Sequence, residues 1–243
     1  MKKLLGYILS PVAIAAFFLL LLIFHPIQWM CYNWGGYKAH KRSVDILNFF
    51  LFHTVYIMGG SVTFINNYDL PLNRPMIFLA NHQSLFDIPP LIYYLRKYHA
   101  KFISKLELTK GIPSISYNLK VGGGANIDRK DPRQSITELV NLANRMKNNN
   151  WSAVIFPEGT RSKDGKVKPF QSAGVATLLK KCPNALLVPV AIKDSWKMGR
   201  YGSFPLNPFT AMSWTVLEPI EPGTTPVEEL VKEVEDQIRA AVE

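Results

Sequence analysis

The sequence predicts an α/β protein with a mostly parallel central sheet flanked by helices, preceded by an apolar N-terminal pair of helices. Two observations lead to this fold class. From Gly59 onward, short apolar runs of strand length alternate with amphipathic helical stretches, which is typical of parallel sheets with crossover helices. Before that point, residues 4–24 contain no charged side chain. We therefore expect an N-terminal membrane anchor in residues 1–60 and an α/β domain in residues 61–243.

The first apolar run, Leu4 to Phe24, is just long enough as a helix to cross a hydrocarbon core. A secretory signal peptide is the alternative, but no small-residue cleavage site follows the run. Aromatic residues and then basic residues come next, as at a membrane interface: Trp29, Tyr32, Trp34, Tyr37, Lys38, Lys41 and Arg42.

A second apolar segment runs from Val44 to Met58 and is interrupted by polar residues such as Asp45 and Asn48. It is too short and too polar to span a bilayer by itself. Positive charges flank the first helix on both sides, so they do not indicate a direction of crossing. We favour a two-helix hairpin that dips into one leaflet over a single span, with the basic, aromatic stretch as its turn.

Seven strands are expected in the α/β domain: Ser61–Ile65, Met76–Ala80, Lys101–Ile103, Ala125–Asp128, Ala153–Phe156, Leu186–Ile192 and Ser213–Leu217. Between and after them, three helices are expected. One is capped by Asp131 with Pro132 at its first position, one covers Gln171 to Cys182, and the last begins at Val227.

The composition indicates an acidic partner and an apolar environment. The chain has 243 residues with a net charge of +10, 48% hydrophobic residues and only 19% charged residues. Anionic lipid, a phosphorylated substrate or nucleic acid would fit the charge. Nucleic acid is disfavoured because basic residues interleaved with aromatics occur mainly at the N-terminal turn. Cys31 and Cys182 lack metal-ligand spacing, so neither a metal site nor a disulfide framework is indicated.

The first candidate site follows the strand Met76–Ala80, where His82 is succeeded by Asp87 five residues later. The carboxylate can accept from one ring nitrogen and leave the other free to take a proton. The chain has no Gly-x-Ser-x-Gly nucleophile elbow. We therefore expect the missing hydroxyl to belong to the substrate.

The second candidate site follows the strand that ends at Phe156 and contains Glu158, Gly159 and Arg161. Gly159 allows close approach of the backbone to a ligand, and Arg161 can grip phosphate with two hydrogen bonds. Glu158 either takes a substrate hydroxyl or holds Arg161 in place. Loops after parallel strands gather at one sheet edge, so this site and His82 are expected to share a cleft.

Two further basic residues follow predicted strands in the same way. Lys105 comes directly after Lys101–Ile103, and Arg129 directly after Ala125–Asp128. Both are candidate phosphate contacts.

With both strand-end motifs present, the chain resembles the glycerolipid acyltransferases, and most closely the bacterial 1-acyl-sn-glycerol-3-phosphate acyltransferases. Their NHxSxxD block is matched by Asn81, His82, Ser84 and Asp87, and their FPEGTRS block by Phe156 to Ser162.

A looser block is matched by Lys105 and by Gly124 to Arg129, and a proline-centred strand block by Leu187 to Ala191. The blocks occur in the family's order, and the resemblance covers residues 75–192.

The resemblance implies a fold of the glycerol-3-phosphate acyltransferase type and an acyl transfer without a covalent acyl-enzyme. His82 would be the general base on the sn-2 hydroxyl of lysophosphatidic acid, oriented by Asp87. Arg161 would be the main phosphate contact, Glu158 and Gly159 would shape the glycerol site, and Lys105 and Arg129 would assist. A block associated with the acyl donor corresponds to Val188 and Pro189.

The acyl donor would be acyl-CoA or acyl-carrier protein, and no metal or bound cofactor is implied. An anionic lipid acceptor explains the N-terminal helices and the positive charge, which place the pocket at the cytoplasmic face of a cell membrane. A glycerol-3-phosphate or other lysophospholipid acyltransferase is the alternative within the same chemistry. A non-catalytic membrane lipid-binding protein is the alternative outside it, but that function does not require His82 and Asp87 at a strand end.

Overall fold

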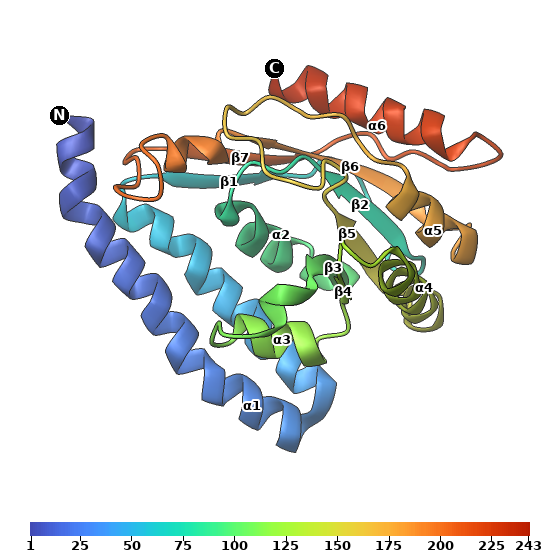
Figure 1. Ribbon diagram of the computed structural model, residues 1–243, viewed down its shortest axis with the longest axis horizontal. Coiled ribbons are helices and arrows are strands. Elements are labelled where there is room, and N and C mark those ends of the chain that lie inside the picture. Colours follow the sequence, from blue (N-terminus) through green and yellow to red (C-terminus); the bar gives the residue numbers. More distant parts are fainter.

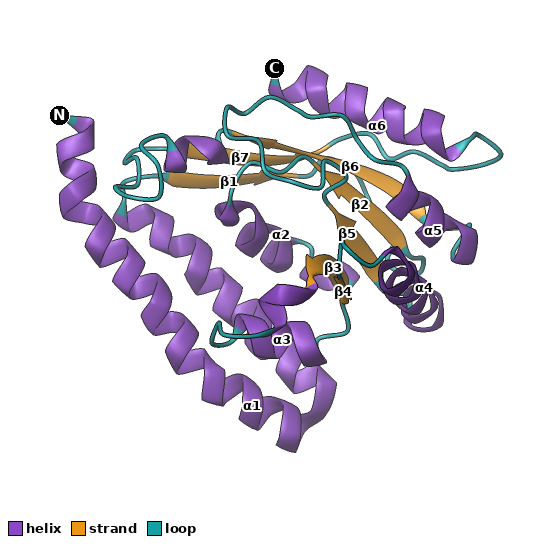
Figure 2. Cartoon of the chain, in the orientation of Figure 1, coloured by secondary structure: helices purple, strands orange, loops and turns teal.

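The computed structural model describes all 243 residues, and its centre is a seven-stranded sheet with helices on both faces (Figures 1 and 2). The strand order is β1-β7-β6-β2-β5-β3-β4. Every neighbouring pair is parallel except β6 and β7. The predicted mostly parallel α/β sheet is therefore confirmed, and β2 to β6 all end at the same edge.

All seven expected strands are present, and their ends lie within two residues of the predictions. They are β1 (Ser61–Ile65), β2 (Met76–Ala80), β3 (Ala100–Lys105), β4 (Ala125–Ile127), β5 (Ser152–Ile155), β6 (Leu186–Lys193) and β7 (Ala211–Val216).

The sheet buries a separate apolar core on each face. On β2, Ile77 and Leu79 point into the core formed with α4 (Pro132–Asn149), α5 (Ala173–Lys181) and α6 (Val227–Val242). Phe78 and its neighbours on the other side of β2 pack with the end of α1 and with α2 (Ile88–Tyr94). Because both faces are covered, β2 is apolar throughout instead of alternating with polar residues.

The N-terminal segment is a single helix, α1 (Lys2–Ile57), rather than two separate helices. The expectation of two separate helices joined by a turn was wrong, because the aromatic and basic stretch is helical apart from Gly36. Only Gly36 leaves helical geometry, with φ 67° and ψ −164°, a conformation that is essentially restricted to glycine.

At Gly36 the helix folds back on itself (Figure 1). Leu21 in the first half packs with Leu47 and Leu51 in the second half, and the rings of Phe24 and Phe50 lie 6.3 Å apart. Phe52 contributes to the core of the sheet, so the second half of α1 is joined to the α/β body. The proposed boundary at residue 60 stays a prediction.

The helices expected in the α/β domain are confirmed, and short ones were missed. Asp131 caps α4, accepting a hydrogen bond from the backbone N–H of Gln134 at 3.0 Å. The unpredicted helices α2 and α3 (Ile115–Val121) have seven residues each, which is too short to show a helical repeat.

Candidate active site

The carboxyl edge of the sheet brings most of the predicted site residues together. His82 lies two residues beyond β2, the loop with Arg161 follows β5, Lys105 ends β3, and Arg129 lies two residues beyond β4. These four strands are adjacent in the order β2-β5-β3-β4. Neighbouring strands are about 4.8 Å apart, so Arg161 belongs to the loop nearest His82 and Arg129 to the most distant one.

A local hydrogen-bond motif turns Asp87 back toward His82. The hydroxyl of Ser84 accepts from the backbone N–H of Phe86 at 3.0 Å, while the carboxylate of Asp87 accepts from the N–H of Ser84 at 2.9 Å. This capping box begins a short 3₁₀ helix, Leu85–Asp87. As a result, Asp87 Oδ2 lies 2.8 Å from His82 Nδ1.

The carboxylate of Asp87 is fully buried and surrounded by donors. Besides His82, its oxygens accept from the N–H of Gln83 at 2.6 Å, from the N–H and hydroxyl of Ser84, and from the hydroxyl of Ser195. Since a carboxylate in this setting only accepts, the hydrogen of His82 lies on Nδ1. Nε2 therefore carries the free lone pair, and it makes no hydrogen bond within the protein.

The imidazole of His82 is also held by an aromatic ring. Phe156, the residue after β5, stacks on it with centroids 4.1 Å apart and planes inclined by 20°. Only 16% of the His82 side chain is exposed. Phe156 and Asp87 together hold the ring of His82 in place.

Glu158 joins the two strand-end loops. Its Oε1 accepts from the backbone N–H of His82 at 2.8 Å and its Oε2 from that of Lys168 at 3.3 Å, while the carbonyl of His82 accepts from the N–H of Ser162. Burial raises the pKa of Glu158 to about 7. Glu158 makes no hydrogen bond to Arg161, so the expectation that it holds Arg161 was wrong, while its contact with a substrate hydroxyl stays a prediction.

Three residues that were not predicted as site residues complete the support of this pair: Phe156, Gln83 and Ser195. Gln83 accepts from the hydroxyl of Ser195 at 3.3 Å and from the N–H of Trp196 at 3.4 Å. Ser195 lies two residues beyond β6, a position equivalent to that of His82 after β2. Applying the strand-end criterion to β6 would have identified it.

The predicted phosphate contacts are exposed and largely unpaired. The side chains of Arg161 and Arg129 form no hydrogen bond or ion pair, and Lys105 contacts only the exposed Glu107 at 3.2 Å. Gly159, with φ 69°, allows the turn that carries Arg161, and nothing in the protein occupies the space beside it. These cations are available to an anionic ligand.

Val188 and Pro189 do not reach the edge of the sheet. Both are buried within β6, paired with Phe78 and Leu79 of β2. Buried in this way, the two side chains are not accessible for direct contact with an acyl donor. Their position instead supports the strand that carries His82.

A cavity of about 420 Å³ lies between α1, α2, α3 and β3. Leu85 and Ile88 line it near His82 and Asp87, and most of its wall is apolar. Lys101 lines it at the opposite end of β3, where its ammonium donates to the carbonyl of Gly122 at 2.6 Å. Burial lowers the pKa of Lys101 to about 7.

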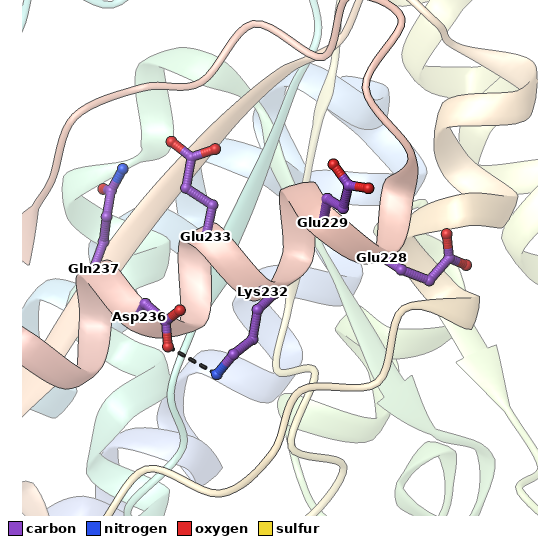
Figure 3. A pocket seen from close by; sticks show the side chains of 6 residues that line it. All are labelled: Glu228, Glu229, Lys232, Glu233, Asp236 and Gln237. Carbon is purple, nitrogen blue, oxygen red and sulfur yellow. Dashed lines mark hydrogen bonds and ion pairs between the residues drawn. The ribbon is translucent and has the colours of Figure 1, made fainter.

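A second hollow, on the outer face of α6, has a different character (Figure 3). Its lining is entirely polar: Glu228, Glu229, Lys232, Glu233, Asp236 and Gln237. Lys232 pairs with Asp236 at 2.8 Å, and the opposite side of the helix is buried in the core. The excess of carboxylates would repel an anionic substrate, so this is the solvated face of an amphipathic helix.

Comparison with known proteins agrees with the geometry. A family model described as Acyltransferase matches residues 61–193, which is more than half of the chain and includes β1 to β6. The chain resembles a chloroplast 1-acyl-sn-glycerol-3-phosphate acyltransferase of Brassica napus with 35% identity, over 54% of this chain and 36% of that protein. It resembles the protein of the same name in Helicobacter pylori with 33% identity, over 58% of this chain and 57% of that protein.

The chain thus spans only about a third to a little over half the length of these relatives. Among solved structures, the 1-acyl-sn-glycerophosphate acyltransferase PlsC from Thermotoga maritima superposes with a TM-score of 0.80 and 22% identity. The match covers 99% of this chain and 96% of that one, so the two share the whole fold, including α1.

Proposed function

The chain belongs to the Acyltransferase family, and on that basis we propose that it transfers a fatty acyl group from an acyl thioester to the sn-2 hydroxyl of 1-acylglycerol 3-phosphate, giving phosphatidic acid. The observation that carries this proposal is the pairing of His82 with the buried Asp87, with Nε2 unengaged, on the same sheet edge as Arg161. The donor is acyl-CoA or acyl-carrier protein, and no bound cofactor takes part.

In this mechanism His82 Nε2 removes the proton from the acceptor hydroxyl as its oxygen attacks the thioester carbon. The negative charge of Asp87 stabilises the imidazolium that forms. When the carbon–sulfur bond breaks, the imidazolium returns the proton to the leaving thiolate. Alignment of hydroxyl, imidazole and thioester supplies much of the rate, and no acyl-enzyme forms.

The phosphate of the acceptor binds to Arg161, assisted by Lys105 and Arg129. The guanidinium of Arg161 is exposed and free of carboxylates, and its loop neighbours that of His82. Phosphate bound there would place the glycerol hydroxyl toward Nε2. The apolar cavity beside Leu85 and Ile88 suits a fatty acyl chain.

The long apolar helix α1 is consistent with membrane association. Many of its large side chains are exposed, including Leu4 at 67% and Trp34 at 78%. We propose that α1 lies in the cytoplasmic leaflet and returns to the same side at Gly36, drawn also by the protein's positive charge to anionic lipid. In this position the enzyme reaches a lipid acceptor without extracting it from the bilayer.

An acceptor panel tests the proposal. Purified protein is given one acyl-CoA together with lysophosphatidic acid, glycerol 3-phosphate or lysophosphatidylcholine, and thiol release is measured. Of the three acceptors, only lysophosphatidic acid is expected to give thiol release. His82→Ala should abolish this release while its melting temperature equals that of the parent protein. Turnover with glycerol 3-phosphate only would move the assignment to that acceptor, and full turnover in His82→Ala would remove the mechanism.

A further inference from the structure

The loop that precedes β7, residues 199–209, carries exposed aromatic side chains that the proposed reaction does not use. Phe204 is 47% exposed and Phe209 is 54% exposed. Neither lines the cavity beside the catalytic pair. Large apolar side chains exposed on one loop indicate a contact with something outside the chain.

This loop is bound to the N-terminal end of α1. The N–H of Leu206 donates to the hydroxyl of Ser10 at 2.9 Å, and the ring of Phe204 meets that of Tyr7 edge-on with centroids 5.5 Å apart. At Gly6 a Cβ would lie 2.7 Å from the carbonyl oxygen of Leu206, so the helix and the loop touch backbone to backbone. The aromatic loop therefore continues the exposed apolar surface of α1.

The backbone of Phe209 is unusual for so large a residue. Its φ of 57° lies in the left-handed region, which bulky side chains rarely adopt. Its ring covers Gly59, where a Cβ would lie 2.6 Å from the ring, yet more than half of the side chain remains exposed. An aromatic ring exposed to water does little to offset this backbone strain. A ring seated among lipid headgroups gains favourable contacts that offset it.

The charges around this patch fit an anionic surface. Lys2, Lys3 and Arg200 are exposed and form no ion pair, and the ammonium of Lys3 lies 5.8 Å from the ring centre of Tyr201. Apolar side chains edged by unpaired cations are the pattern of a segment that lies in the interface of a bilayer with anionic lipid.

We propose that residues 199–209 form a second membrane-contacting element, which seats Phe204 and Phe209 among the headgroups of an anionic bilayer next to the start of α1. This rests on the proposed membrane association of α1 but not on acyl transfer. The loop lies near the N-terminus and far from the reversal of α1 (Figure 1). A contact beside α1, in addition to the contact that α1 makes itself, restricts rotation about the helix axis and so sets the orientation of the His82 edge toward the lipid.

The test compares the full-length protein with the double variant Phe204→Ser, Phe209→Asn. Asparagine tolerates the left-handed backbone, so the substitution is not expected to strain the fold. Ile136→Ser is the matched control, because Ile136 is likewise 54% exposed but lies on α4, away from α1 (Figure 1). Binding is measured by co-sedimentation with vesicles of phosphatidylcholine and phosphatidylglycerol in equal parts.

We expect the double variant to partition roughly ten- to a hundredfold more weakly, with an unchanged melting temperature, and the control to partition like the parent protein. Unchanged partitioning would overturn the proposal. So would a lower melting temperature in Phe209→Asn alone with vesicle binding retained, because the ring would then serve the fold. If the double variant fails to fold, Phe204→Ser alone decides by the same criterion.

Acyl transfer to detergent-dispersed lysophosphatidic acid is measured in parallel. The parent protein and the double variant should then be equally active, since neither phenylalanine contacts the site. If the double variant and the parent protein bind vesicles equally while acyl transfer is intact, only the loop proposal is rejected. Absence of acyl transfer in the parent protein rejects only the proposed function.

Discussion

Replacing Asp87 by asparagine removes the negative charge beside His82 while preserving the shape of the side chain. Oδ2 of Asp87 accepts from three N–H groups, those of His82 Nδ1, Gln83 and Ser84. An amide nitrogen in that place would meet three donors, so the amide oxygen takes it. The amide nitrogen then faces the hydroxyls of Ser84 and Ser195, which can turn to accept.

The tautomer of His82 is therefore retained, and what is lost is the attraction between carboxylate and imidazolium. The 2.8 Å contact puts the two charge centres close together. Opposite unit charges about 4 Å apart attract by about 4 kcal/mol at an effective dielectric constant of about 20. Since about 1.4 kcal/mol corresponds to a tenfold change in rate, kcat is expected to fall about a thousandfold in Asp87→Asn.

The assay is thiol release from the acyl thioester at saturating lysophosphatidic acid, together with the melting temperature of each variant. The control is the double variant His82→Ala, Asp87→Asn, which should be no slower than His82→Ala alone, because the two side chains act as one unit. Retention of more than about a tenth of kcat in Asp87→Asn would refute the electrostatic argument. Independent, multiplying losses in the double variant would refute the coupling of the pair.

Three further predictions concern the surroundings of the pair. Arg161→Ala should raise KM for lysophosphatidic acid roughly ten- to a hundredfold with the thioester KM unchanged, because charged hydrogen bonds contribute about 1.5–3 kcal/mol; a change confined to the thioester KM would contradict this role. Ser195→Ala removes a donor to a buried carboxylate, a contact of about 1.5–3 kcal/mol, and should lower the melting temperature by about 3–12 °C in a thermal scan; an unchanged value would show that the contact contributes nothing. The pKa of Lys101 is about 7 in the folded chain and 10.5 ordinarily, so between these values the unfolded chain binds more protons and stability rises with pH, by up to about 1.4 kcal/mol per unit. Denaturant titrations at neutral and alkaline pH should show this rise in the parent protein and lose it in Lys101→Met; an equal rise in both would exclude Lys101 as its source.

Local patterns in the sequence were sufficient for the elements themselves. The apolar run of β2 and the proline-led start of α4 are determined within a few residues, and both appear as expected. The same holds for His82 and Asp87, since a capping box spanning four residues brings the carboxylate back. Short-range geometry of this kind depends only on neighbouring side chains, so it can be predicted from a short window of sequence.

The N-terminal helix shows where local signals mislead. The basic, aromatic stretch was expected to be a turn, yet it is helical except at Gly36, where the chain reverses. Packing of Leu21 against Leu47 stabilises the two halves of α1 against each other. This contact joins residues that are distant in sequence, and tertiary packing overrides the weaker local preference.

By itself, then, the sequence determined the strands, the helices α4, α5 and α6, and the pairing of His82 with Asp87. Only the tertiary structure decided that β5 lies beside β2, that Glu158 holds the backbone of His82, and that Ser195 reaches Asp87. The physical reason is distance along the chain. Contacts between residues about a hundred positions apart depend on the order of strands in the sheet, which no short window of sequence contains.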